Sequence, residues 1–545
     1  MIAGINNIQK LLSDVLKRFD ISDTVEIRYS NIENVDVQCN NLVRYSKNPD
    51  ILEIKKEIIS NVKKSQLVKH IEINDQNFIN INLSDEYLYK FSQNLKKRIS
   101  HNKINSVIID YGGPNIGKDL HVGHIRTLNI GRALYNILEL SGSKVISDIH
   151  FGDWGMPVAQ IIAYIEFKKL DINEIDFQDL EVIYPKANQL SRENEDFYDV
   201  AKGIAKNLNS GNKDYLKQWE KIYNIAIPNI KRLLEKLGHN FDWYYGESSV
   251  VKETDLVVSK ALKNGKIKED SGALISTQES DPPILITKSD GSYLYLTTDL
   301  GTVVFRENKS NFDKYIYVVD SRQKNHFEQL FKTIEYFDLS KSDFYHVGFG
   351  TINGADNKPF RTRDGGVYKL SLLFEDIKEK LRKYNSDDSI LNTLTNTVLA
   401  YSDLLPNRNQ NYVFDVDNFT DINGRTGIYI QYAQVRAKKL LENSNFKNDY
   451  STNLELSSEE RNLLLMITKF DNFFNLSLSN MEPHHLAEYL YNICKAFNSF
   501  YTNIKIFGDD IPNDIQANRL KIVEEFYNTV ILVFKCLGIE PVNKM

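Results

Sequence analysis

Two histidines, His121 and His124, stand three residues apart at the end of the sequence Pro-Asn-Ile-Gly-Lys-Asp-Leu-His-Val-Gly-His. Before a helix, free backbone N–H groups and the positive end of the helix dipole attract anions. Gly117 and Gly123 allow the backbone to approach a nucleotide closely. Lys118 and the two imidazoles add cationic or donor groups beside the phosphates. Nucleotidyl transfer needs such groups because negative charge grows on the departing pyrophosphate. The loop therefore predicts an ATP site.

Two other interpretations of the histidine pair remain open. The imidazoles could cap or pack the first turn of a helix, as many His-x-x-His pairs do. They could also hold a metal, but no third ligand at suitable spacing and no His-Glu-x-x-His pattern accompanies them. The nucleotide interpretation is preferred because of the elements that flank the loop.

These flanking elements form one βαβ unit. Residues 106–111 have the pattern of a buried strand, 121–140 that of a helix and 144–149 that of a second strand. Strand, glycine-containing loop, helix and strand indicate a parallel sheet with helices packed on it. The further strands expected in this sheet are 283–287, 315–320 and 344–349.

At 545 residues the chain is too long for a single core, and about three domains are expected. Residues 1–100 alternate helix and strand signals, which predicts a small α+β domain. Residues 101–384 predict a Rossmann-like α/β catalytic domain with a helical insertion at 170–237. Residues 385–545 lack strand signals and predict an all-α bundle.

The composition is that of a globular protein, with 42% hydrophobic and 26% charged residues. No segment approaches the roughly 20 apolar residues of a membrane helix, and the first residues lack a secretory pattern. Three widely spaced cysteines indicate neither a disulfide framework nor a zinc knuckle, so we expect a cytoplasmic protein. The net charge of −6 does not indicate a nucleic-acid binder, although a local basic face can bind RNA.

The histidine loop resembles the signature of class I aminoacyl-tRNA synthetases. The longer match, from Tyr111 through His124 and on to Gly152-Asp153-Trp154-Gly155, resembles the arginyl-tRNA synthetases, and the resemblance continues over almost the whole chain. It implies that the chain activates L-arginine with ATP, as a Mg²⁺ complex, to arginyl-adenylate. It then transfers arginine to the 3′-terminal ribose of tRNA(Arg), releasing AMP and pyrophosphate. We expect a monomer with no tightly bound metal.

An arginine pocket requires oxygen acceptors, because a guanidinium has five donors and no acceptor. By resemblance, Asp299 pairs with the guanidinium, Tyr295 orients it, and Asn115 and Gln323 hold the amino-acid end. Taken singly, Tyr295 could be a packing residue of a sheet and Asp299 a helix N-cap. The arginine-binding residues that the resemblance implies are Asp110, Gly113, Pro114, Asn115, His124, Glu247, Tyr295, Asp299 and Gln323.

A second basic loop, Lys358 to Gly366, resembles the relaxed second signature of arginyl enzymes, in which an upstream lysine compensates for a weak loop. That gives Lys118 a principal role. Taken alone, the loop could be a solvated basic turn. The implied catalytic residues are Lys118, His121 and His124. The implied ATP-binding residues are Gly117, Lys118, His121, Gly123, His124, Lys358, Arg361 and Arg363.

The two ends of the chain resemble the family's tRNA-binding domains. Tyr429, Tyr432 and Arg436 offer stacking faces and donors for unpaired anticodon bases, although helix packing would also explain the tyrosines. Gln38 and Asn40 could read a base near the tRNA corner or simply form turns. The implied tRNA-binding residues are Gln38, Asn40, Tyr429, Tyr432, Arg436 and Met545.

Two rival functions remain. A class I synthetase for another amino acid would not need Asp299, whereas a catalytically silent paralogue would bind RNA without charging it. The presence of Lys118, His121 and His124 argues against the silent paralogue.

Overall fold

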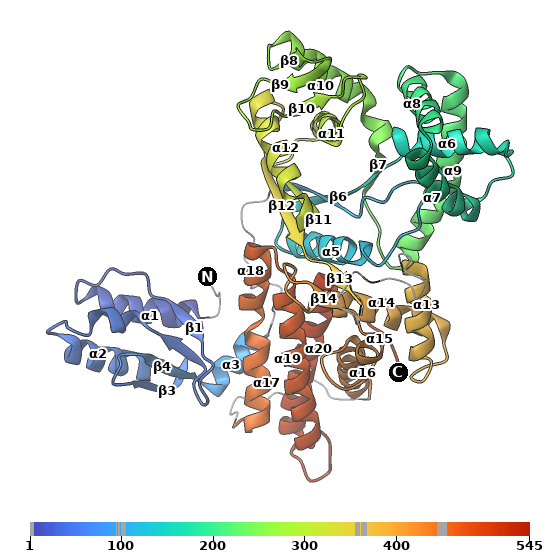
Figure 1. Ribbon diagram of the computed structural model, residues 1–545. Helices are drawn as coiled ribbons and strands as arrows, with labels where there is room; N and C mark the ends of the chain where they lie inside the picture. The colour runs from blue at the N-terminus through green and yellow to red at the C-terminus, as the bar shows by residue number, and fades with distance from the viewer. Residues whose placement is uncertain are drawn as a thin grey trace. The chain divides into compact units, whose positions relative to one another are not determined.

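The computed structural model describes residues 5–93, 95, 99, 105–354, 360, 368–443 and 455–545. The chain divides into two compact units (Figure 1). One unit combines residues 1–102 with 421–545, and the other comprises residues 103–420. The division into domains at residues 100 and 384 stays a prediction.

The central element of residues 103–420 is a five-stranded, wholly parallel sheet in the order β12-β11-β5-β6-β7 (Figure 1). The register places Asp110 opposite Asp148 on β6 and Tyr317 on β11. A parallel sheet whose strands are joined by crossover helices is the Rossmann-like arrangement predicted from the sequence. The strands are β5 (Ser106–Tyr111), β6 (Lys144–Phe151), β7 (Trp243–Gly246), β11 (Lys314–Asp320) and β12 (Asp343–Phe349).

Two sequence predictions need correction. The segment at 283–287 forms β10 (Leu285–Thr287) of a separate antiparallel sheet, with β9 (Ala273–Ser276) and β8 (Ile267–Asp270). A short apolar run has no feature that specifies its partner strand. The helix expected from residue 121 begins at His124, because the preceding backbone pairs with residues 368–370.

Helix α5 (His124–Leu140) packs on β5, β6 and β11. The three helices that come after β7 pack against β10 and β11 in one buried apolar core. These helices are α10 (Val251–Lys263), α11 (Tyr295–Lys309) and α12 (Lys324–Phe337), with the short 3₁₀ turns η2 (Glu247–Val250) and η3 (Ser321–Gln323) before α10 and α12.

The predicted helical insertion is present between β6 and β7 (teal in Figure 1). It has its own apolar core, which includes Ile116 of the histidine loop. Its helices are α6 (Met156–Lys168), α7 (Phe177–Glu193), α8 (Glu195–Asn209) and α9 (Lys213–Lys236). After the sheet come β13 (Ile352–Asn353), α13 (Leu370–Leu381), α14 (Asp388–Leu404), β14 (Tyr412–Val413) and α15 (Val416–Phe419). Strand β14 pairs with β13, so one short strand lies in a region expected to be entirely helical.

The other unit contains a four-stranded antiparallel sheet in the order β1-β2-β4-β3 and a helical bundle. Its first part comprises α1 (Asn6–Lys17), β1 (Ile27–Tyr29), β2 (Val37–Cys39), η1 (Asn41–Tyr45), α2 (Ile51–Lys63), β3 (Val68–Ile73), β4 (Ile79–Leu83) and α3 (Asp85–Ser92). The bundle comprises α16 (Gly427–Glu442), α17 (Ser458–Thr468), α18 (Phe470–Asn480), α19 (His484–Asn503) and α20 (Asn513–Leu537). Among the described helices, none has the length and apolar character needed to span a bilayer.

Candidate active site

The histidine loop leaves the carboxyl end of β5 and is fixed to the end of β6. Gly152 N–H donates to the Pro114 carbonyl at 3.0 Å, and Ile116 N–H donates to the Gly152 carbonyl at 3.1 Å. Pro114 is buried, whereas Gly113 and Asn115 are exposed. Gly117 has a φ of +86°, which favours glycine, and a Cβ there would lie 2.9 Å from Ile161 of α6. The loop therefore presents Asn115 at an edge where ligands of open α/β sheets bind.

The two imidazoles pack against each other, with ring centroids 4.0 Å apart. His121 N–H donates to His124 Nδ1 at 3.0 Å, and Gly123 N–H donates to His121 Nδ1 at 3.1 Å. Burial lowers the pKa of His124 to about 3, and burial followed by the charge of Lys118 lowers the pKa of His121. Both rings are therefore neutral near pH 7 and can serve as hydrogen-bonding groups before a nucleotide binds. Gly123 is exposed beside them.

Lys118 is exposed on the same loop, and its Nζ lies over the ring of Tyr184 at 4.8 Å from the centroid. Tyr184 belongs to α7, so the insertion supplies a face on which the cation rests. Nearby, the backbone of His121 forms an antiparallel β-bridge with that of Lys369. The Nζ of Lys369 pairs with Glu181 of α7 at 2.9 Å. Lys358, Arg361 and Arg363 of the second loop lie outside the described residues.

One face of α11 carries Tyr295, Asp299, Thr302 and Arg306, at spacings of four, three and four residues. Tyr295 opens the helix and is 71% exposed, so the sheet-packing interpretation of this residue is wrong. Asp299 lies in the second turn, so it is not the N-cap, a position that Leu294 occupies. The face thus runs from an exposed tyrosine to a buried arginine.

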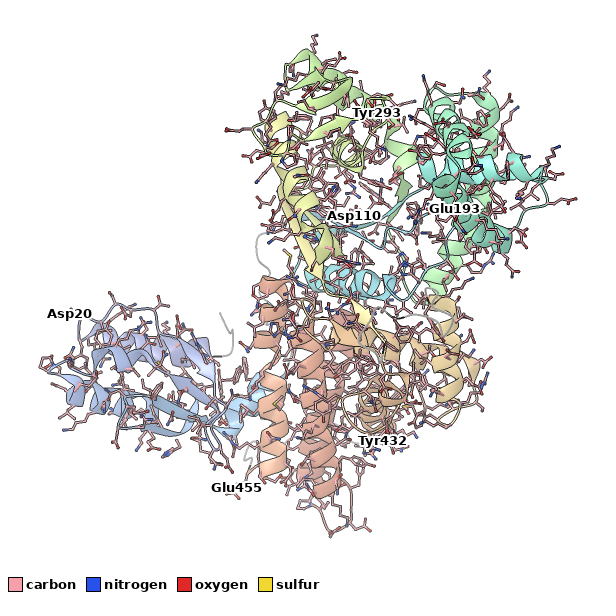
Figure 2. The ribbon with its side chains drawn as sticks, viewed as in Figure 1. Asp20, Asp110, Glu193, Tyr293, Tyr432 and Glu455 are labelled. Atoms are coloured by element: carbon pink, nitrogen blue, oxygen red, sulfur yellow. The ribbon has the colours of Figure 1, made fainter. Side chains whose placement is uncertain are left out.

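The buried end of this face is an ion network. Arg306 donates to Asp148 Oδ2 through Nε at 3.1 Å and through a terminal nitrogen at 2.7 Å. It also pairs with Asp110, which is labelled in Figure 2. Arg306 is fully buried, and Asp148 is 1% exposed. The Asp110 carboxylate is thereby committed to a guanidinium of the chain itself. The role of Asp110 toward free arginine stays a prediction.

Glu247 lies close to this face, at the start of η2. Burial, followed by the negative charges of Asp153 and Asp299, raises the pKa of Glu247 to about 8. Asp153 is fully buried and accepts hydrogen bonds from Ser248 N–H at 2.9 Å and Ser248 Oγ at 2.6 Å, which fixes η2 to the end of β6. An acid that is neutral at pH 7 because it is buried beside two anions would ionise more readily next to a bound cation.

Asp299 has a partner within the chain, because its Oδ2 lies 2.7 Å from His326 Nε2. His326 is in the first turn of α12, three residues after Gln323, which is exposed at the end of η3. Lys118 Nζ lies over the Tyr184 ring, and Asp299 pairs with His326. Between these two pairs, burial and then the charge of a neighbouring group raise the pKa of Tyr184 beside Tyr295, of Tyr295 beside Glu247, and of Glu247 near Asp153 and Asp299. Sequence reasoning missed Tyr184, Arg306 and His326. The three-residue spacing of Gln323 and His326 at a helix start was the available signal for His326.

The predicted RNA-contacting residues lie in the other unit. Arg436 donates to Asn498 Oδ1 and to the Tyr432 hydroxyl, each at 3.1 Å. Its guanidinium lies over the ring of Tyr432, the residue labelled in Figure 2, at 4.1 Å. Tyr429 packs on Tyr491, with centroids 5.5 Å apart. Gln38 donates to Asn80 Oδ1 at 2.7 Å, Asn40 is exposed before η1, and Met545 is half-buried.

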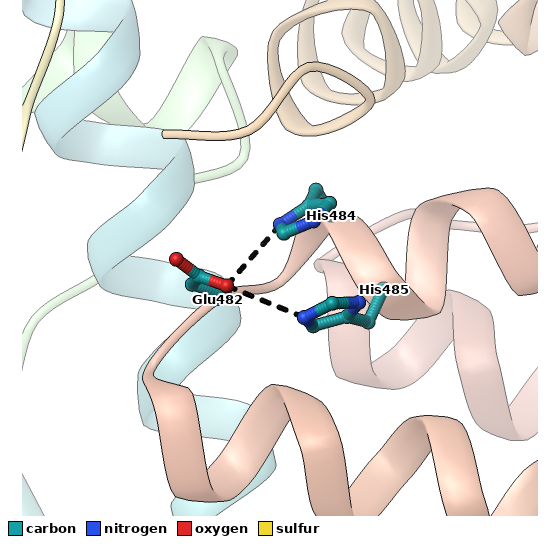
Figure 3. A group of neighbouring side chains, drawn as sticks. All are labelled: Glu482, His484 and His485. Carbon is teal, nitrogen blue, oxygen red and sulfur yellow. Dashed lines mark ion pairs between the residues drawn. The ribbon is translucent and has the colours of Figure 1, made fainter. Parts of the chain in front are cut away.

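The same unit brings Glu482, His484 and His485 together at the start of α19 (Figure 3). Glu482 Oε2 lies 3.3 Å from His485 Nε2 and 4.0 Å from His484 Nδ1. Two imidazoles and a carboxylate are suitable ligands for a transition metal. Within the described ranges, this is the one group of three such side chains close enough to share an ion. Ion pairing between Glu482 and the histidines also accounts for the arrangement.

Three family models together match most of the chain. The model described as "tRNA synthetases class I (R), catalytic domain" matches residues 86–416, "Arginyl tRNA synthetase N terminal domain" matches 6–83, and "DALR anticodon binding domain" matches 430–545.

Sequence and structural relatives agree with these models. The arginine–tRNA ligase of Francisella tularensis subsp. tularensis (strain SCHU S4 / Schu 4) is 32% identical over 99% of both chains. That of Alkaliphilus oremlandii (strain OhILAs) is 32% identical over 93% of both. The arginyl-tRNA synthetase of Plasmodium falciparum matches with a TM-score of 0.82 and 26% identity over 100% of both chains. The Thermus thermophilus arginyl-tRNA synthetase shares the fold, with a TM-score of 0.79 and 16% identity over 99% of this chain and 100% of that one.

Proposed function

This chain belongs to the arginyl-tRNA synthetase family. We propose that it activates arginine between the histidine loop and the exposed half of the α11 face, which carries Tyr295 and Asp299, and then charges tRNA(Arg). The observation that carries the proposal is that the Lys118 loop follows the carboxyl end of β5, Glu247 follows that of β7, and His326, the partner of Asp299, follows that of β11. A cation for the polyphosphate and acids for a guanidinium thus lie along one edge of the parallel sheet.

In the first step, a carboxylate oxygen of arginine attacks the α-phosphorus of ATP, and the bond to the pyrophosphate oxygen breaks. Lys118 stabilises the charge that grows on the pyrophosphate, while the neutral His121 and His124 rings donate hydrogen bonds to phosphate oxygens. Mg²⁺ enters with ATP as part of the substrate. No side-chain nucleophile is required, so catalysis consists of positioning and charge stabilisation.

The arginine side chain lies along the exposed half of the α11 face. Asp299 accepts from the guanidinium, and Glu247 ionises as the cation arrives. Tyr295 covers the pocket entrance, and Asn115 and Gln323 hold the ammonium and carboxylate end. Neutral amino acids would leave these acids without a cation, so the pocket discriminates without a separate proofreading step.

In the second step, a hydroxyl of the terminal tRNA ribose attacks the carbonyl carbon of arginyl-adenylate, and AMP leaves. The bundle that contains Tyr429, Tyr432 and Arg436 binds anticodon bases by stacking and hydrogen bonding. The N-terminal sheet, with Gln38 and Asn40, contacts another part of the tRNA. The enzyme acts as a cytoplasmic monomer.

The test is ATP–pyrophosphate exchange with each amino acid in the presence of tRNA(Arg). We expect exchange with arginine alone, and its absence would overturn the proposal. A synthetase for another amino acid would keep its exchange in Asp299→Ala, whereas we expect this variant to lose exchange with arginine. Retention of tRNA in a gel-shift experiment without any charging would instead identify a silent RNA-binding paralogue.

A further inference from the structure

The acid proposed to recognise the guanidinium is paired with a histidine of the chain itself. Asp299 Oδ2 and His326 Nε2 are 2.7 Å apart and join α11 to α12. The side chains of Asp299 and His326 are 34% and 30% exposed, respectively, so both can exchange protons and ligands with solvent. This pair differs from the buried Arg306 network, which has no comparable access to an incoming substrate.

The pair favours a protonated imidazole. The hydrogen bond and charge of Asp299 raise the pKa of His326, although burial opposes this and the first turn of a helix disfavours a cation. The nearby histidine on β12 behaves differently: burial lowers the pKa of His346, whose ring stacks on Phe327 at 4.9 Å. The carboxylate of Asp299 therefore distinguishes His326 from a half-buried histidine on the adjacent strand.

Other ionisable groups surround this pair. They include Tyr295 on α11, Glu247 on η2, Tyr317 on β11, His346 on β12, the Arg322–Asp320 pair of η3 and β11, and the Lys324–Glu328 pair on α12. The ion pairs balance their own charges. Glu247 is the one group in this set whose pKa is shifted to about 8, so its titration must be separated from that of His326.

We propose that His326 occupies the place of the guanidinium beside Asp299 until arginine binds, and that arginine displaces it as a cation, which then loses its proton to solvent. The inference rests on the proposed role of Asp299 and adds a positioning residue to the arginine site. Before binding, His326 keeps the carboxylate oriented and paired. After binding, the guanidinium provides the positive charge, and the neutral imidazole no longer competes. One cation replaces another, so the charge of the site is conserved.

The experiment is isothermal titration of the full chain with L-arginine near pH 7, in buffers of different ionisation enthalpy. The dependence of the observed heat on the buffer gives the number of protons released. We expect release in the wild type and, in His326→Gln, a release that is smaller by up to about one proton. Glu247→Gln should remove the separate contribution of Glu247, and the double variant should release close to none.

Affinity provides a second readout. Protons compete with arginine at His326, so binding should weaken as the pH falls through the pKa of this histidine. The ratio of the Kd at pH 6 to the Kd at pH 8 should be smaller in His326→Gln, by at most about tenfold for each pH unit, whereas a merely structural role would not change this ratio. His346→Gln is the matched control and should keep the wild-type proton release.

Equal proton release from wild type and His326→Gln would overturn the inference. The proposed arginine site would be wrong, independently of this inference, if Asp299→Asn bound arginine as tightly as the wild type. Circular dichroism and the unfolding midpoint verify that each variant is folded, and His326→Asn supplies a second substitution in case the glutamine variant does not fold.

Discussion

Gly152 and Asn115 meet so closely that a Cβ atom on Gly152 would lie 2.0 Å from Asn115 Oδ1. The two residues also form a parallel β-bridge, which extends the pairing of their strands beyond the sheet. The side chain proposed to hold the amino-acid end of arginine is therefore positioned by the bare backbone at the end of β6. This contact explains why the loop and Gly152 belong to one sequence pattern.

Gly152→Ala should displace the Asn115 amide and impair use of arginine. A misplacement of about 1 Å can lower a rate by about a hundredfold, so we expect kcat/KM for arginine to fall between tenfold and a hundredfold in pyrophosphate exchange. Gly203→Ala is the control, because a Cβ at Gly203 in α8 meets nothing within 4 Å. Unchanged kinetics in Gly152→Ala would show that Asn115 does not need its observed position.

Lys118 should be the most sensitive residue of the ATP loop. Lys118→Met removes the cation but keeps an unbranched side chain, and exchange should fall by about a hundredfold or more. Tyr184→Leu removes only the aromatic face beneath Nζ, which contributes about 0.5–1 kcal/mol, so a loss of about two- to fivefold is expected. If both variants lost activity equally, the ring and not the charge would be the essential feature.

The parts of the fold that could be predicted were those with local signals. Residues 106–111 were located as β5 because an apolar run ends at a glycine turn. The features that were missed depend on residues far apart in sequence. The backbone of Lys369 pairs with that of His121, so the helix begins later than expected. Arg306 pairs with Asp110, which is 196 residues away in the sequence. Neither contact has a local pattern. The resemblance supplied Asp299 without its partner His326, because it concerned residues that contact the substrate and not the residues that pair with them.

The Arg306 network should be mainly structural. Arg306→Met leaves two adjacent carboxylates, Asp110 and Asp148, without their cation, and breaking a buried pair in this way costs about 3–5 kcal/mol. We expect a clearly lower midpoint of urea unfolding. Arg322→Ala removes an arginine that is 78% exposed and should change stability by less than about 0.5 kcal/mol. A midpoint unchanged by Arg306→Met would contradict the assignment.

His124 should make the folded protein sensitive to acid. Its pKa is about 3 in the folded state and ordinarily 6.5, so below pH 6.5 the unfolded chain takes up a proton that the folded chain does not. Stability is therefore lost as the pH falls from 6.5 toward 3. His124→Asn lacks this loss of stability. The urea midpoint of the variant, relative to that of the wild type, should therefore rise as the pH is lowered from 7.5 to 5. His70→Asn, on the exposed part of β3, is the control substitution.

Arg436 tests the proposed RNA surface independently of the chemical step. Arg436→Met removes the bonds to Asn498 and the Tyr432 hydroxyl and the cation over the Tyr432 ring. If these groups bind the anticodon, the KM for tRNA(Arg) should rise about tenfold with little change in kcat, and the salt dependence of binding should fall by about one ion. Arg425→Ala removes an exposed ion pair with Glu488 in the same unit and serves as the control. A lower kcat with an unchanged KM would mean that Arg436 does not act through tRNA binding.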